Sequence, residues 1–287
     1  MAYLERQLDE FNPDLQHQFR HTLHNHPLMQ FDELTKLALR NPQVRFHSAK
    51  LERTHRFDKV REEHITGLTL QETLDNIEVS GSFVYIKEIQ KDPIYAPLVQ
   101  EIYKEIQKDT SKFHKSISRV QAWIFITSPG GVTPYHRDFE TNHYFHIKGK
   151  KTLFLWDPKD KDVVSQEENE YFHGVHSLAK TLYTEEKFKK ASRYDLGPSM
   201  GVFFPYTAPH MVENGTDEFS ISLSITYTTA EDIQVRRIHK INQLLRKIGI
   251  KPTDIEKQIK LVYRLKLGAH WVLRTIVFFA LSDWMGS

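Results

Sequence analysis

The alternation of hydrophobic and polar positions changes along the chain, and its middle part has the pattern of β-strands. Stretches rich in β-branched and aromatic residues occur at 83–89, 120–128, 143–149, 151–157, 200–205 and 219–228. The last stretch alternates strictly, with serine and threonine on one face and Phe219, Ile221, Leu223 and Ile225 on the other. Several short strands separated by Gly, Pro and Asn turns predict a mainly β jelly-roll core, that is, a double-stranded β-helix.

Helical patterns flank this core on both sides. Thr69 and Glu72 have the spacing of a capping box before an apolar i, i+4, i+7 series. After the last strand, Ile255, Ile259 and Val262 again have helical spacing. We therefore expect a helical or irregular elaboration of the core over residues 1–80, a jelly-roll catalytic core over 81–231 and a basic helical region over 232–287.

Composition narrows the class of protein. The chain has 287 residues, 39% of them hydrophobic, with 39 Lys and Arg against 37 Asp and Glu, so a disordered or fibrous protein is excluded. It has no Cys, and any metal must therefore be held by His and carboxylate.

The N-terminus lacks the pattern of a signal peptide, and the apolar run 269–281 is too short to span a bilayer. We expect no transmembrane segment and a cytoplasmic location.

Positive charge is concentrated near the C-terminus. Residues 236–274 contain 11 Lys and Arg but only 2 Asp and Glu. Amphipathic basic helices can contact an anionic membrane surface or an acidic partner, and this alternative stays open. The apolar run that ends near Trp284 and Met285 favours burial against protein. We therefore expect a homodimer formed through the C-terminal helices.

One combination of residues indicates a metal centre. His136 and Asp138 are two residues apart, and on an extended strand both side chains would point to the same face. His210 precedes the last alternating strand and could supply a third ligand. Two His and one carboxylate on one side of a metal are typical of non-haem Fe(II) oxygenases. Competing donors are His143, His146, His173 and His176, of which the last two are predicted to lie in an exposed loop.

The sequence around this triplet resembles the Jumonji C, or cupin-like, 2-oxoglutarate oxygenases. Thr133 lies three residues before His136, Asn142 lies four after Asp138, and Lys151 lies thirteen after Asp138. The resemblance is sharpest over residues 131–156. It is closest to the branch of the asparaginyl hydroxylase that inhibits hypoxia-inducible factor.

The resemblance implies a cupin-like fold and a role for each matched residue. His136, Asp138 and His210 would be the catalytic metal ligands for Fe(II). Lys151, with hydroxyl groups from Tyr85 and Thr133, would bind the distal carboxylate of 2-oxoglutarate. Lys150 is the alternative cation, because only one of two neighbouring strand residues can point inward.

Two further positions complete the predicted cosubstrate site. Asn142 has its counterpart in the family pattern. Ser224 stands where the hydroxylase has an Asn near the metal, so the surroundings of the 2-oxoglutarate C1 carboxylate differ here.

These features predict an Fe(II)- and 2-oxoglutarate-dependent dioxygenase. Such an enzyme uses O2 to hydroxylate an unactivated C–H bond. The primary substrate is open between a protein side chain, a small molecule and a lipid-linked compound. The alternative is a non-redox metal-binding cupin, an isomerase or sugar-binding module, which would have no use for Lys151 or Tyr85.

Overall fold

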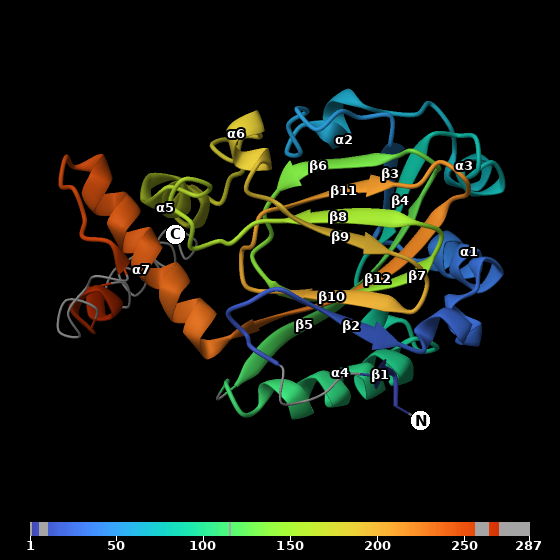
Figure 1. Ribbon diagram of the computed structural model, residues 1–287, viewed down its shortest axis with the longest axis horizontal. Helices are drawn as coiled ribbons and strands as arrows, with labels where there is room; N and C mark the ends of the chain where they lie inside the picture. Colours follow the sequence, from blue (N-terminus) through green and yellow to red (C-terminus); the bar gives the residue numbers. More distant parts are fainter. Residues whose placement is uncertain (1, 6–10, 115, 256–263, 270–287) are drawn as a thin grey trace, which may run out of the picture.

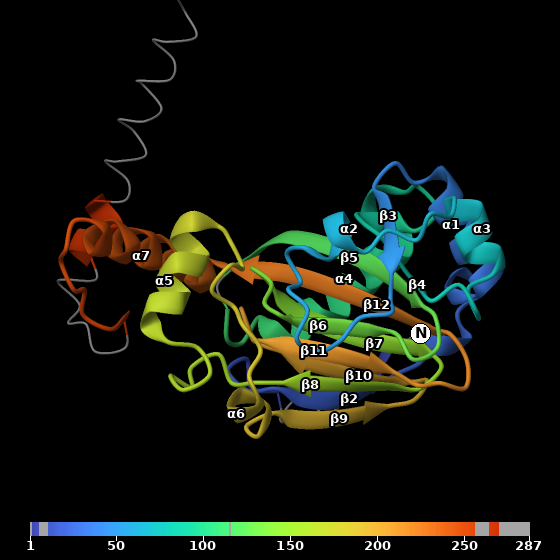
Figure 2. The ribbon, with the colours of Figure 1, turned by 90° about the horizontal axis from the view of Figure 1, so that it is seen from above.

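The computed structural model describes residues 2–5, 11–114, 116–255 and 264–269. Within them the strands form two antiparallel sheets that face each other as a jelly roll, as Figures 1 and 2 show. The eight-stranded sheet has the order β1-β2-β10-β7-β12-β5-β4-β3, and the four-stranded sheet has the order β6-β11-β8-β9. The predicted fold class is therefore confirmed.

The larger sheet consists of β1 (Leu4–Glu5), β2 (His17–His21), β3 (Val44–Ser48), β4 (Ser82–Ile86), β5 (Ile117–Thr127), β7 (Thr141–Lys148), β10 (Met200–Phe204) and β12 (Ser220–Thr229). The smaller sheet consists of β6 (Val132–His136), β8 (Lys151–Leu155), β9 (Ser192–Leu196) and β11 (His210–Asn214). The helices are α1 (Phe31–Arg40), α2 (Val60–Glu63), α3 (Leu70–Asp75), α4 (Ala96–Thr110), α5 (Gln166–Val175), α6 (Glu185–Phe188) and α7 (Ala230–Lys247).

All six predicted strands are present, but the first 80 residues differ from the expectation. They contribute β1, β2 and β3 as well as helices, so describing them as helical or irregular is wrong in part. β2 pairs with β10 and β3 pairs with β4, which extends the large sheet at both edges. β2 (HQFRH) and β3 (VRFHS) contain more His, Arg, Gln and Ser than apolar residues, so they lack the β-branched and aromatic runs that indicated the predicted strands. The division of the chain into three regions stays a prediction.

The central strand β12 separates the hydrophobic core from the interior of the jelly roll. Its apolar residues belong to one cluster with Leu34 of α1 and Ile102 of α4, which lie outside the barrel. Its serine face points the other way, and Ser224 and Thr226 line a cavity between the sheets. The helices therefore cover apolar surface, while the space inside the barrel is partly polar.

Helices α5 and α7 close one end of the barrel, at the left in Figure 1. α7 begins directly after β12 with a capping box formed by Thr229 and Asp232. The expectation of an exposed loop at His173 and His176 is wrong for His173. It lies in α5, is 1% exposed and stacks on His239 of α7, because α7 covers this face of α5.

The C-terminal predictions are tested only in part. α7 confirms that a helix follows the core, whereas Val262 and the apolar run after 270 lie outside the described residues. Within the described part of the chain, no helix is both long enough and apolar enough to cross a membrane. The dimer and the contact with an anionic surface stay predictions.

Candidate active site

Two strands bring the predicted histidines together. β6 ends at His136 and β11 begins at His210, and these two residues are directly paired in the antiparallel ladder. Their ring centroids are 4.0 Å apart. Directly opposite residues of an antiparallel pair project to the same face, so both rings enter the space between the sheets.

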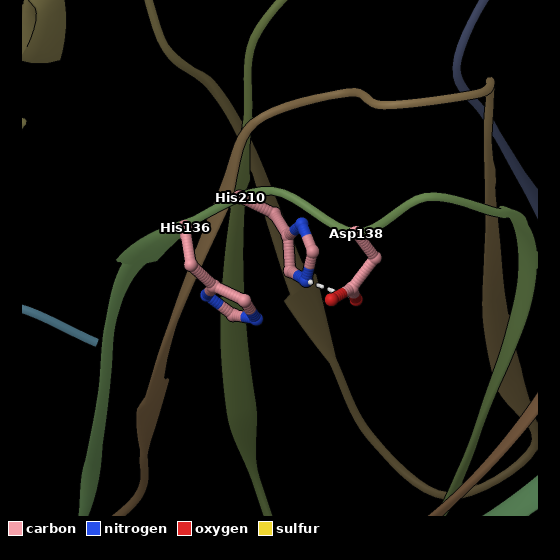
Figure 3. A group of neighbouring side chains, drawn as sticks. All are labelled: His136, Asp138 and His210. Carbon is pink, nitrogen blue, oxygen red and sulfur yellow. Dashed lines mark ion pairs between the residues drawn. The ribbon is translucent and has the colours of Figure 1, made fainter. Parts of the chain in front are cut away.

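Asp138 completes the group from just beyond the end of β6. The expectation that it shares an extended strand with His136 is wrong, because β6 stops two residues earlier. Its Oδ2 lies 3.5 Å from Nε2 of His210. A dashed line joins the two side chains in Figure 3. The three potential ligand atoms are all within 4.8 Å of one another. In the described part of the chain this is the only such group, so the competing histidines do not join it.

Backbone carbonyls determine which imidazole nitrogen is free. Nδ1 of His136 lies 2.8 Å from the carbonyl oxygen of Pro134, and Nδ1 of His210 lies 3.1 Å from that of Ala208. A carbonyl oxygen only accepts, so each Nδ1 carries the proton and each Nε2 keeps its lone pair. Desolvation by burial, followed by the charge of His210, lowers the pKa of His136 to about 3, which keeps this ring neutral. This is the state that binds a divalent metal.

The segment that carries the ligands is anchored on both sides. Phe57 stacks on the ring of His136 at 3.8 Å. Arg137, between the two ligands, points away from them and is 1% exposed. It donates to the Asn169 side chain at 2.5 Å and to the Thr207 carbonyl at 3.0 Å. The buried guanidinium thereby ties the ligand segment to α5.

A cavity of about 320 Å³ opens beside the three ligands. Its lining includes the whole triad and every residue predicted to bind the cosubstrate, namely Tyr85, Thr133, Asn142, Lys151 and Ser224. Aromatic side chains from β4 and β5 form another part of its wall, among them Trp123 and Phe125. The size is suited to a small cosubstrate together with part of a second molecule.

Lys151 carries a positive charge into this cavity. It is 3% exposed, and its Nζ donates to the hydroxyl of Tyr144 at 2.8 Å and to that of Ser222 at 2.9 Å. Both partners are neutral, and no described carboxylate pairs with it. Burial lowers the pKa of Lys151 to about 7. Lys150 points outward to Asp217, so of these two neighbouring lysines it is Lys151 that faces the cavity.

Three residues around Lys151 were not predicted from the sequence. Tyr144 and Ser222 supply its hydroxyl partners, in addition to Tyr85 and Thr133 elsewhere in the cavity. Nε2 of His146 lies 2.8 Å from the Gly149 carbonyl, so its Nδ1 accepts from Ser222 at 3.1 Å. This orients the lone pairs of Ser222 toward Lys151. Strand alternation places these side chains inside, but only the register shows which of them meet the lysine.

Asn142 and Ser224 form a second polar pair in the cavity. Nδ2 of Asn142 donates to Oγ of Ser224 at 3.0 Å. The side chain of Asn142 is 5% exposed, and its Oδ1 has no hydrogen-bond partner in the described structure. A buried acceptor without a partner is costly, so this atom suits a group that donates a hydrogen bond to it.

A jelly roll with two histidines and one carboxylate beside an internal cavity has the features of a cupin-type metal-site protein. The chain belongs to the family described as the cupin-like domain, whose model matches residues 12–233. This confirms the predicted resemblance at the level of the cupin-like family and fold. The closer likeness to the asparaginyl hydroxylase stays a prediction.

Solved structures with a similar fold include a ribosomal oxygenase, YcfD, of Escherichia coli. One structure of it has a TM-score of 0.50 and 13% identity, and the match covers 95% of this chain and 68% of that one. Another, described as a complex with cobalt and 2-oxoglutarate, has a TM-score of 0.48 and 13% identity, with 92% and 64% covered. No curated protein matches the sequence. At this identity the similarity shows the fold alone.

Replacing either histidine of the triad should abolish metal binding. His136→Ala or His210→Ala removes one of two neutral nitrogen ligands, and we expect no saturable Fe(II) binding in anaerobic calorimetry. Asp138→Ala should retain weak binding, because both imidazoles remain. His176→Ala, on an exposed histidine, is the control and should bind as the unchanged protein does. Full metal affinity in His210→Ala would contradict the assignment of the third ligand.

Proposed function

We propose that this chain is an Fe(II)- and 2-oxoglutarate-dependent dioxygenase that hydroxylates an unactivated C–H bond. The observation that carries the proposal is Lys151, a buried cation without a carboxylate partner in the same cavity as the triad. Burying an unpaired charge is costly, so the site fits an anionic ligand close to the metal. A non-redox cupin would leave this lysine without a counter-ion.

The residues present fit both groups. His136, Asp138 and His210 would hold Fe(II), and their confinement to one side leaves other coordination positions open. Lys151, Tyr144 and Ser222 would bind the distal carboxylate of 2-oxoglutarate, with Tyr85 and Thr133 in the same cavity. Asn142 and Ser224 offer an amide and a hydroxyl to its other end.

When bound, Fe(II) supplies the oxidising chemistry together with 2-oxoglutarate and O2. The protein's own contribution is to position these groups and to keep water out. Aromatic side chains on β4 and β5 exclude water from one wall of the cavity, and the carbonyls of Pro134 and Ala208 hold the two imidazoles in one tautomer. The Escherichia coli protein of similar fold is described as a ribosomal oxygenase, so this fold is compatible with oxygenase activity. The primary substrate is a protein side chain, a small molecule or a lipid-linked compound.

An anaerobic titration tests this function directly. Metal-free protein receives Fe(II) and then 2-oxoglutarate while its visible absorption is recorded. We expect a charge-transfer band that appears only when both are present, because the C1 carboxylate and ketone of 2-oxoglutarate must chelate the iron. Full metal binding without such a band would favour the non-redox cupin.

Lys151→Ala should weaken 2-oxoglutarate binding without removing the metal. A buried charge-assisted hydrogen bond contributes on the order of 1.5 to 3 kcal/mol, so Kd should rise roughly ten- to a hundredfold. Calorimetry with the metal already bound gives this value. Lys150→Ala, which removes the same charge one residue away, should leave Kd unchanged. An equal effect of both variants would mean that Lys151 does not contact the cosubstrate.

Binding of 2-oxoglutarate should weaken as pH rises above about 7. The pKa of Lys151 is lowered to about 7 by burial, and only its ammonium form attracts the carboxylate. A bound carboxylate favours that form, so Kd increases once the ligand-free lysine loses its proton. His136 and His146, each with a pKa lowered to about 3 chiefly by burial, stay neutral throughout this range.

The measurement is Kd from pH 6.5 to 9 in the presence of Mn(II). Lys151→Arg serves as the control, because a guanidinium keeps its proton at every pH used. Its Kd should change little over the series. The same pH dependence in both proteins would assign the titration to another group.

A further inference from the structure

Three basic side chains gather at the end of the barrel where α7 begins. Arg236 and Lys240 lie one turn apart on α7, and residues with this spacing share a helix face. Arg119 is on β5, whose neighbouring residue Ser118 pairs with Thr228 just before the helix. Burial, and after it the charges of Arg236 and Arg119, lower the pKa of Lys240. The three groups are thus close enough to repel one another.

None of these three cations has an acidic partner at ion-pair distance within the described structure. Elsewhere on the same helix Arg246 pairs with Glu170 at 2.6 Å. The acidic residue on which the charges of Arg119 and Arg236 act is Glu140, which is one of the residues that line the cavity. Like charges held together without counter-ions are unfavourable unless an anion binds between them.

The cluster is held beside the candidate metal centre. The guanidinium of Arg236 lies 5.1 Å from the ring of Phe139, which directly follows Asp138. Phe139 in turn stacks on Phe172 of α5 at 3.9 Å. Arg119 has a φ of 55°, a left-handed conformation that is unfavourable for a non-glycine residue. The pairing of β5 with β12 shifts register nearby, between Thr226 and Thr228.

We propose that Arg119, Arg236 and Lys240 bind a phosphate monoester on the primary substrate. This inference rests on the proposed function and names the class of substrate. A phosphate monoester carries close to two negative charges at neutral pH and several acceptor oxygens, so two or three of these cations can bind it together. A guanidinium also fits two phosphate oxygens at once. Anchored there, the rest of the substrate extends past Glu140 into the cavity and toward the metal.

The test uses the full chain and glycerol 3-phosphate as the probe. Calorimetry should show saturable binding of this ester and none of glycerol. Arg236→Gln and Lys240→Gln should each raise Kd by roughly tenfold, because each removes one charge-assisted contact. Arg237→Gln is the matched control: it removes the same charge from the neighbouring residue of α7 and should leave Kd within about twofold. Arg236→Lys, which keeps the charge, should bind more tightly than Arg236→Gln.

A second arm identifies the source of the phosphate. Vesicles containing phosphatidic acid present the same monoester as a lipid headgroup. Vesicle binding that depends on Arg236 but not on Arg237 also supports the site and assigns it to a lipid substrate. Absence of saturable binding to both probes overturns the proposal, as does an equal loss in Arg236→Gln and Arg237→Gln.

Failure of the phosphate site and failure of the dioxygenase proposal give different results. If the unchanged protein shows the charge-transfer band with Fe(II) and 2-oxoglutarate but binds neither phosphate probe, only the substrate assignment fails. If it binds glycerol 3-phosphate with the expected variant pattern but never forms the band, the dioxygenase proposal fails and the anion site stands.

Discussion

The two-sided character of β12 is the constraint on which the rest of the structure depends. Its leucine and isoleucine side chains are buried against helices outside the barrel, and a smaller hydrophobic cluster that includes Leu153 and Phe204 fills only part of the interior. The opposite face carries serine and threonine, which are small and can form hydrogen bonds. The interior therefore keeps a cavity in which polar groups are tolerated, and this cavity holds the candidate site.

Two buried basic side chains of that cavity, His136 and Lys151, differ in their charge. The imidazole of His136 is neutral, since burial holds its pKa far below its ordinary value. Lys151 brings a charge that only hydroxyl groups accompany. The site thus places a buried cation and several hydroxyl groups close to a group of metal ligands, an arrangement complementary to a chelating anion. The 2-oxoglutarate proposal and the predicted pH dependence both follow from Lys151, a buried cation without a carboxylate partner in the described structure.

Helix α7 connects the barrel to the C-terminal region. It begins at the end of β12 and packs on α5, which itself receives the buried guanidinium of Arg137 from between the two metal ligands. Arg236 on the same helix lies over Phe139, directly after Asp138. The charge concentration seen in the sequence from residue 236 onward therefore starts beside the site. A role for its first residues in binding an anion is compatible with a role for later ones in assembly.

Much of the fold could be predicted because its signal is local. Strict alternation over 219–228 depends only on neighbouring residues, and it indicated both the strand and its two faces. For Lys150 and Lys151, the alternation of one strand predicted only that one of the two points inward, and the choice of Lys151 came from the family resemblance. The short strands β2 and β3, and β6, β9 and β11 of the smaller sheet, were not predicted as strands, because their mixed polar sequences lack a run of β-branched and aromatic residues.

The amino-acid sequence by itself determined the kinds of ligand available, the spacing of His136 and Asp138, and the mainly β class. These are properties of residue types and short-range periodicity. Tertiary structure alone decided that His210 stands opposite His136, that Tyr144 and Ser222 surround Lys151, and that Arg236 lies over Phe139. Each of these contacts joins segments distant in the chain, and their register depends on the packing of whole strands and helices rather than on any local preference.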